Sequence, residues 1–182
     1  MPFTPRLTSA GMPYPWWEDG NKYYDSGNGL PNCTCYCYGR AAEILGGWDT
    51  NLPNGNGMDW FDEAVNAGYQ TGMVPQLGAI MCFAPRTLPS TALGHVATVE
   101  VINQDGSVIT SNSGYPNSYF FTETLYPGDG YLSSWMTIPA RNYYLQGFIY
   151  NTDQPIPPAG PWGPWTLINY LRRKRKRRCG LT

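Results

Sequence analysis

Residues 32–47 read Asn-Cys-Thr-Cys-Tyr-Cys-Tyr-Gly-Arg-Ala-Ala-Glu-Ile-Leu-Gly-Gly, and the prediction of the fold starts from this stretch. Apolar residues fall at positions 33, 37, 41, 44 and 45, which is close to the period of an α-helix. Asn32 is a suitable N-cap, and the two glycines at 46 and 47 are typical of a helix end. The stretch therefore predicts a helix whose first turn contains Cys33.

The sequence on either side predicts little before this helix and mostly strands after it. Residues 1–31 are rich in Pro, Gly, Asn, Asp and Ser, which predicts irregular structure. A second helix is expected at 59–67, with Trp60, Phe61, Ala64 and Val65 on its inner face. Strands are expected at 78–83, 94–102, 107–111, 119–125 and 143–150, and the loop 103–106 predicts a hairpin. Helices followed by an antiparallel sheet indicate an α+β fold.

The last thirty residues differ in composition from the rest. Residues 154–164 are typical of a stiff Pro/Trp-rich linker, and seven of the 12 cations lie within residues 172–178. We therefore expect one domain at 1–152, and a linker with a basic tail at 153–182. The tail is either a solvated segment or a group that binds an anionic polymer, a membrane surface or another part of a larger particle.

Charge and hydropathy exclude several classes of protein. The residues before 172 carry 5 cations against 13 anions, a net charge of -8, which argues against nucleic-acid binding by the folded part. No run of 18 apolar residues occurs, so no membrane-spanning helix is expected, and the first residues lack the apolar core of a secretory signal. Five cysteines make an odd count, which indicates reduced thiols rather than a disulfide framework.

Cys33 is the best candidate for a nucleophile. A thiol in the first turn meets the positive end of the helix dipole and unpaired backbone N–H groups, which favour the thiolate. The same N–H groups, with Asn32, could bind an oxyanion. Cys35 and Cys37 point elsewhere on the helix, at about 100° of rotation per residue. We therefore expect Cys35, Cys37 and Cys82 to be packing residues.

His95 is the only histidine of the chain, so any thiol–imidazole catalysis must use it. A four-residue hairpin loop would pair Ile102 with Ser107 and Ala97 with Asn112. The side chains of His95 and Asn112 would then share one face of the sheet, close enough for Asn112 to orient the imidazole. A catalytic thiol needs a neighbouring base, and a third group commonly holds that base in one tautomer.

Several segments together resemble CHAP domains, the cysteine- and histidine-dependent amidohydrolases and peptidases. Residues 32–46 are similar to the cysteine motif of this family, and Gly94-His-Val-Ala-Thr-Val-Glu is similar to its histidine motif. Val108-Ile-Thr-Ser-Asn112 fits the strand that bears the third residue, and segments 75–83 and 119–122 fit the strands on either side. Several motifs in the family's order form a much stronger signal than one motif alone.

The resemblance implies a papain-like fold, with N-terminal helices packed on an antiparallel sheet, and hydrolysis of an amide bond in the peptide part of peptidoglycan. Carried over residue by residue, Cys33 is the nucleophile, His95 the general base and acid, and Asn112 the residue that orients the imidazole; Asn32 would help to bind the oxyanion. No cofactor is implied. N-acetylmuramoyl-L-alanine amidase and peptidoglycan endopeptidase activities both remain open.

The chain departs from the family pattern at two positions. Many relatives have Glu where this chain has Asn112, and a neutral amide stabilises an imidazolium less than a carboxylate does. Cys35 stands where the family has Trp, which predicts the loss of an aromatic wall and places a second thiol near Cys33.

The sequence predicts neither a calcium site nor a zinc site. Some relatives bind calcium through Asp residues just before the nucleophile, where this chain has Tyr24, Ser26 and Asn28. A zinc site formed by alternate cysteines would need a strand at 33–37, whereas the pattern there is helical. We therefore predict no metal and no calcium requirement.

The resemblance also implies a biological setting. It indicates a bacteriophage lysin, either an endolysin or a tail-associated lysin, that is made in the host cytoplasm and acts on the bacterial cell wall. The alternative is a non-catalytic virion or wall-binding component that retains the fold. Fast alkylation of Cys33 at neutral pH would favour the enzyme, because a buried structural thiol reacts slowly.

Overall fold

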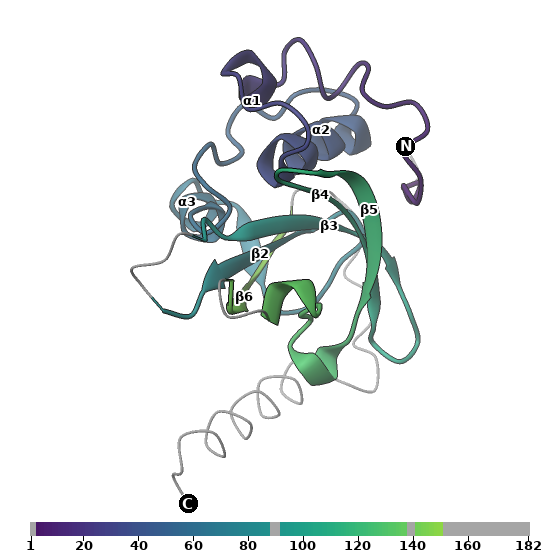
Figure 1. Ribbon diagram of the computed structural model, residues 1–182, viewed down its shortest axis with the longest axis vertical. Helices are drawn as coiled ribbons and strands as arrows, with labels where there is room; N and C mark the ends of the chain where they lie inside the picture. The colour runs from purple at the N-terminus through teal and green to yellow at the C-terminus, as the bar shows by residue number, and fades with distance from the viewer. Residues whose placement is uncertain (1–2, 88–91, 138–140, 151–182) are drawn as a thin grey trace, which may run out of the picture.

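One six-stranded antiparallel sheet, in the order β1-β6-β2-β3-β4-β5, forms the centre of the protein. The computed structural model describes residues 3–87, 92–137 and 141–150. Figure 1 shows helix α2 across one face of the sheet and the short 3-10 helices beneath the opposite face. The predicted α+β arrangement is confirmed. The strands are β1 Gln70–Gly72, β2 Ile80–Pro85, β3 His95–Ile102, β4 Val108–Gly114, β5 Ser118–Leu125 and β6 Tyr143–Tyr150.

Helix α2, Cys33–Leu45, has the predicted bounds because both of its ends are set locally. The Asn32 side chain accepts hydrogen bonds from the backbone N–H groups of Thr34 and Cys35. At the other end, Gly46 adopts the left-handed conformation, with φ of 71°, that lets the chain leave a helix. The helix lies across β3 and β4, and its buried residues run from Thr34 to Ala42.

The segment before α2 is more ordered than its composition predicts. It contains a four-residue helix, α1 Lys22–Asp25, and Trp17 is fully buried against α2. The indole N–H of Trp17 donates to the backbone carbonyl of Tyr36, and the two rings stack at a centroid distance of 5.7 Å. The prediction of irregular structure for 1–31 was wrong at α1, because aromatic packing on α2 compensates for the weak local signal.

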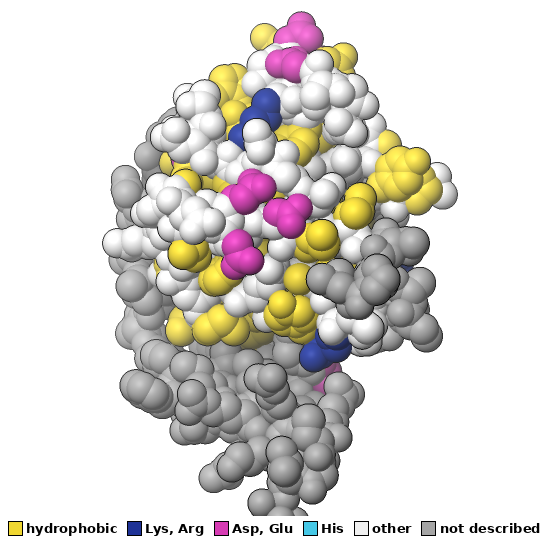
Figure 2. All heavy atoms as spheres, turned by 90° about the vertical axis from the view of Figure 1, so that its left-hand side faces the viewer, with side chains coloured by type: hydrophobic (Ala, Val, Ile, Leu, Met, Phe, Trp, Pro, Cys, Tyr) yellow, Lys and Arg dark blue, Asp and Glu magenta, His cyan; other side chains and the backbone are white. Residues whose placement is uncertain are grey.

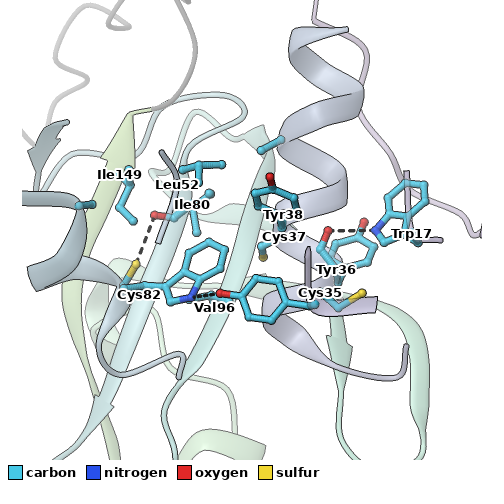
Figure 3. Packing of buried hydrophobic residues seen from close by; sticks show 14 residues of the cluster. Trp17, Cys35, Tyr36, Cys37, Tyr38, Leu52, Ile80, Cys82, Val96 and Ile149 are labelled. Carbon is cyan, nitrogen blue, oxygen red and sulfur yellow. Dashed lines mark hydrogen bonds between the residues drawn. The ribbon is translucent and has the colours of Figure 1, made fainter. Parts of the chain in front are cut away.

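Two apolar clusters lie on opposite faces of the sheet. The first cluster joins α2 and α3 (Trp60–Asn66) to the face that bears Ile80, Cys82 and Val96 (Figure 3). The second contains Met81, Phe83, Ala97, Val99, Tyr131 and Met136. Tyr131 and Met136 belong to the segment with the 3-10 helices Pro127–Asp129 and Trp135–Thr137, which sequence patterns did not predict. Val65, expected on the inner face of α3, is 48% exposed, whereas Trp60 and Ala64 are buried as predicted.

The β3–β4 hairpin differs from its predicted register at one end only. Next to the loop, Ile102 pairs with Val108 instead of Ser107. A bulge between Val99 and Val101 absorbs the extra residue, so that Thr98 faces Ser111 as the four-residue loop predicts. The correct register is therefore restored before the strands reach His95 and Asn112.

Buried charges fasten α2 to the sheet at this bulge. The Glu100 carboxylate is fully buried and accepts from the Arg40 guanidinium at 2.9 Å to each oxygen. The Ser111 hydroxyl and the Arg6 backbone N–H also donate to Glu100, at 2.6 and 2.8 Å. Arg6 and Arg40 further pair with Glu43 on α2. This network satisfies a carboxylate that would be costly to bury alone.

The predicted domain boundary near residue 152, the linker and the basic tail at 153–182 lie outside the described residues. Within the described residues, no helix is long and apolar enough to cross a membrane.

Candidate active site

Cys33 is the first residue of α2, as the sequence predicts, and its side chain is partly exposed. The backbone N–H groups of Val96, Thr34 and Cys33 itself act on the sulfur and lower the pKa of the thiol, but burial raises it more. The net pKa of Cys33 therefore lies above its ordinary value. The helix start does not make the resting thiol a thiolate, contrary to the expectation from its position, because desolvation outweighs the N–H groups.

The N-cap uses most of the N–H groups that were expected to bind an oxyanion. Oδ1 of Asn32 accepts from the backbone N–H of Thr34 at 2.9 Å and from that of Cys35 at 3.0 Å. The Tyr36 N–H donates to the Asn32 carbonyl. Of the helix-start groups, the N–H of Cys33 is left for an oxyanion. The cap uses only Oδ1 of Asn32, so its Nδ2 takes no part in the cap.

His95 is the first residue of β3 and is held there by glycines. Gly94 has φ of 81°, and a Cβ at this position would lie 2.2 Å from the backbone nitrogen of Met58. Its carbonyl accepts from the Tyr143 hydroxyl at 3.1 Å. The chain can turn into β3 only without a side chain at Gly94. The peptide N–H that follows His95 is that of Val96, which is one of the groups that lower the pKa of Cys33, so Cys33 lies near the start of β3.

A chain of hydrogen bonds fixes the imidazole of His95. Nε2 of His95 lies 3.0 Å from Oδ1 of Asn112, which confirms that the two side chains share a face of the sheet. Nδ2 of Asn112 donates to the Thr110 hydroxyl at 2.9 Å, and Thr110 in turn donates to the Glu123 carbonyl at 3.5 Å. The amide of Asn112 must therefore present its oxygen to His95. This orientation protonates Nε2 and leaves Nδ1 as the free base.

Aromatic rings enclose the imidazole. His95 is 1% exposed, and no histidine is visible on the face of the molecule in Figure 2. Phe83 stacks on the ring at a centroid distance of 6.3 Å, and the Trp135 ring meets it edge-on at 4.9 Å. This burial, together with the nearby Arg141 charge, lowers the pKa of His95 to about 4, although Asn112 raises it. The imidazole is consequently neutral at physiological pH and able to accept a proton.

The other cysteines of α2 and β2 are packing residues, as predicted. Cys35, Cys37 and Cys82 are fully buried, and desolvation raises the pKa of Cys35 to about 12. The Asn21 side chain donates to the Cys35 carbonyl at 3.0 Å, so this part of α2 is covered by the segment before it. Cys35 therefore belongs to the buried core, and the loss of an aromatic wall at this position stays a prediction. Cys179 lies outside the described residues.

Sequence reasoning missed the residues that support His95. Thr110 lies two residues before Asn112 on the same strand, so the alternation of a strand could have indicated it. Trp135 and Arg141 come from a segment with no periodic pattern, and only the folded chain brings them to His95. Among the described residues, no three His, Cys, Asp or Glu side chains come together as metal ligands.

Known proteins are similar to this chain over part of its length. The sequence model of the CHAP domain matches residues 22–114, which include Asn32, Cys33, His95 and Asn112. Staphylococcal secretory antigen ssaA2 of Staphylococcus aureus (strain NCTC 8325 / PS 47) is 35% identical over 100 residues, which make up 54% of this chain and 32% of that protein. Staphylococcal secretory antigen SsaA of the same strain is 33% identical over 100 residues, 54% of this chain and 33% of that protein.

The matched segment thus spans about a third of the length of these curated relatives. Among solved structures, a crystal structure of N-acetylmuramoyl-L-alanine amidase from Staphylococcus aureus is 25% identical. That alignment covers 64% of this chain and 31% of the amidase chain, with a TM-score of 0.44.

Proposed function

Because the chain belongs to the CHAP domain family, we propose that it is a peptidoglycan hydrolase that cleaves an amide bond by cysteine nucleophilic catalysis. The observation that carries this proposal is the hydrogen bond of 3.0 Å between Nε2 of His95 and Oδ1 of Asn112. It leaves Nδ1 as a free base near the start of β3, where the Val96 N–H lowers the pKa of Cys33.

The reaction begins from a neutral pair, because burial raises the pKa of Cys33 and lowers that of His95. Nδ1 of His95 accepts the thiol proton as the sulfur attacks the carbonyl carbon of the amide. The carbonyl electron pair moves onto oxygen, where the N–H of Cys33 and Nδ2 of Asn32 stabilise the charge. The carbon–nitrogen bond then breaks, and the imidazolium gives its proton to the departing amine.

Hydrolysis of the thioester completes the cycle. Nδ1 of His95 accepts a proton from water as the water oxygen attacks the thioester carbon. The carbon–sulfur bond breaks, the proton returns to the Cys33 sulfur, and the acid is released. Asn112 keeps Nε2 protonated throughout, so that the same nitrogen, Nδ1, accepts and returns the proton in both halves.

Removal of either reacting group tests the enzyme directly. Cys33→Ala and His95→Ala are expected to lower the lysis of susceptible cell walls at least about 10⁴-fold, measured as loss of turbidity. Cys82→Ala is the matched control, because it removes a buried thiol that takes no part in the reaction. Lysis at the wild-type rate by folded Cys33→Ala would refute the proposal.

The scissile bond is either the N-acetylmuramoyl-L-alanine amide or a peptide bond of the stem or cross-bridge. Both reactions use the same nucleophile, base and oxyanion donors, so the catalytic residues favour neither. Mass spectrometry of a digest of defined peptidoglycan distinguishes them. An amidase releases whole stem peptides from the glycan, whereas an endopeptidase leaves shortened stems on it.

A second candidate function is a non-catalytic wall-binding or virion component that retains the fold. The raised pKa of Cys33 favours it, since a poorly ionised thiol is a weak nucleophile without its base. Alkylation separates the two candidates. If Cys33 is catalytic, an alkylating reagent should modify it more slowly in His95→Ala than in the wild type. If Cys33 is a structural thiol, it should react slowly and at the same rate in both proteins.

Action at the bacterial cell wall follows from the proposed substrate. We further propose a bacteriophage origin, as an endolysin or a tail-associated lysin synthesised in the host cytoplasm, on the family resemblance alone. The basic residues 172–178 would add affinity for anionic wall polymers or phage tail proteins. Deletion of residues 172–182 should then weaken binding to intact cells at low salt, and unchanged binding would contradict this role.

A further inference from the structure

A cation–aromatic pair lies beside the catalytic histidine. The guanidinium carbon of Arg141 lies 3.8 Å from the centroid of the Trp135 ring, and the same ring meets His95 at 4.9 Å. Trp135 is held from a third side by Tyr143, at a centroid distance of 6.2 Å. Both Trp135 and Arg141 are half-buried. The Arg141 guanidinium therefore contacts a ring that itself packs against His95.

The donors of Arg141 are largely uncommitted. This contact is a cation–π interaction, which does not need the N–H groups of the guanidinium as hydrogen-bond donors. One of them, on Nη1, donates to the Trp135 carbonyl at 3.4 Å, which is a long hydrogen bond. Within the described part of the chain, the ion pairs involve Arg6 and Arg40 but not Arg141.

The rest of the domain makes this charge unusual. Before the basic tail the chain has 5 cations against 13 anions, and Figure 2 shows acidic side chains gathered on one face with few basic ones. Arg6 and Arg40 neutralise Glu43 and Glu100, and Lys22 lies over the Tyr38 ring at 4.5 Å. An anionic substrate would be repelled by most of this surface and attracted near Arg141 and near Arg86, whose backbone N–H donates to the Asn142 carbonyl at 2.9 Å.

We propose that Arg141, held on Trp135, binds a carboxylate of the peptidoglycan stem peptide beside the scissile amide. The inference rests on the proposed function and adds a specificity determinant to it. Guanidinium and carboxylate match in a planar, two-bond geometry, and stem peptides carry free carboxylates near the bonds that such enzymes cut. Binding there would place the amide next to Cys33 and His95.

The test compares two substrates that differ only in charge. Soluble peptidoglycan fragments are used as isolated and after carbodiimide-mediated amidation of their carboxyl groups. The wild type is expected to cleave the amidated fragments with kcat/KM lowered about 10- to 100-fold, mostly through KM. Arg141→Gln should lose a similar factor on the native fragments and no longer distinguish the two substrates. Arg141→Lys should restore part of the preference.

Two controls separate recognition from structural support. Arg86→Gln removes the same charge from a second arginine that lies over an aromatic ring, that of Tyr144 at 5.9 Å, and should keep the wild-type preference. The apparent pKa of the acid limb of the pH profile should rise in Arg141→Gln, because Arg141 helps to lower the pKa of His95. In Arg141→Lys this pKa should stay low, because the positive charge is kept. A role confined to holding Trp135 would change kcat and leave the preference for carboxylate intact.

Binding measurements distinguish failure of this inference from failure of the proposed function. The full chain with Cys33→Ala is titrated calorimetrically with both fragments, with and without Arg141→Gln. Tighter binding of the native fragments that depends on Arg141 supports the carboxylate site even if the wild type cleaves neither fragment. Equal binding of both fragments, or a preference that survives Arg141→Gln, overturns it.

Discussion

The two faces of the sheet supply different halves of the site, which approach each other at the start of β3, where the Val96 N–H lowers the pKa of Cys33. On the helix-covered face, Cys33 and its cap are set by neighbouring residues, and a buried ion network holds α2 in place. On the opposite face, His95 is positioned by contacts that are distant in sequence, with Asn112, Trp135 and Arg141. The nucleophile thus depends on local structure and the base on tertiary packing. Substitutions on the two faces should therefore have different effects on stability, turnover and pH dependence.

The largest effect is expected from the ion network of the helix-covered face. Arg40→Leu would leave the fully buried Glu100 without its guanidinium, which should lower the free energy of unfolding by about 3–5 kcal/mol in urea denaturation. Arg6→Leu, which removes a more exposed arginine of the same network, should cost about 1 kcal/mol. Equal losses for the two variants would show that burial of Glu100 is not the cause.

The N-cap of α2 allows stability and catalysis to be separated. Asn32→Asp keeps the oxygen that caps Thr34 and Cys35 but removes the Nδ2 donor, so kcat should fall about 10²- to 10³-fold with little change in unfolding. Asn32→Ala should lose both the capping oxygen and the Nδ2 donor. Its kcat should fall as in Asn32→Asp, and its free energy of unfolding should fall by about 1 kcal/mol as well. If Asn32→Asp retains full activity, Asn32 is a cap and not an oxyanion donor.

On the opposite face, the buried His95 should make the free energy of unfolding depend on pH. Because the folded-state pKa of His95, about 4, lies below its unfolded value of 6.5, the folded state resists protonation. The stability that this neutral histidine allows is fully present above pH 6.5 and is lost as pH falls towards 4, by about 3 kcal/mol. His95→Gln should lack this component. Unfolding curves of both proteins between pH 7 and 4 measure the difference, and parallel losses would contradict the shift.

The smallest effect is expected at Thr110. Thr110→Val keeps the shape of the side chain but removes the hydroxyl that orients the Asn112 amide, so kcat should fall about tenfold, equivalent to about 1.4 kcal/mol. Thr110→Ser should retain activity. A wild-type rate in Thr110→Val would mean that Asn112 alone fixes the tautomer of His95.

The same division explains what could be predicted from the sequence. Helix α2, the position of Cys33 and the face shared by His95 and Asn112 follow from periodicity and from the length of one hairpin loop. The segment with Trp135 and the early helix α1 have no such pattern, and their positions follow from aromatic contacts across the fold. The ionisation of Cys33 was mispredicted for a related reason, since local position indicates the helix dipole but not the desolvation.

The bulge between Val99 and Val101 has a practical consequence for protein engineering. Because the bulge absorbs the register difference of the hairpin, a change in the pairing next to the loop at 103–106 need not alter the register at the catalytic end of the same two strands. A short peptide tag or a fluorophore attachment sequence placed at Gln104 or Asp105 should therefore leave turnover intact. This loop is a rational site for immobilising or labelling the protein without disturbing its chemistry.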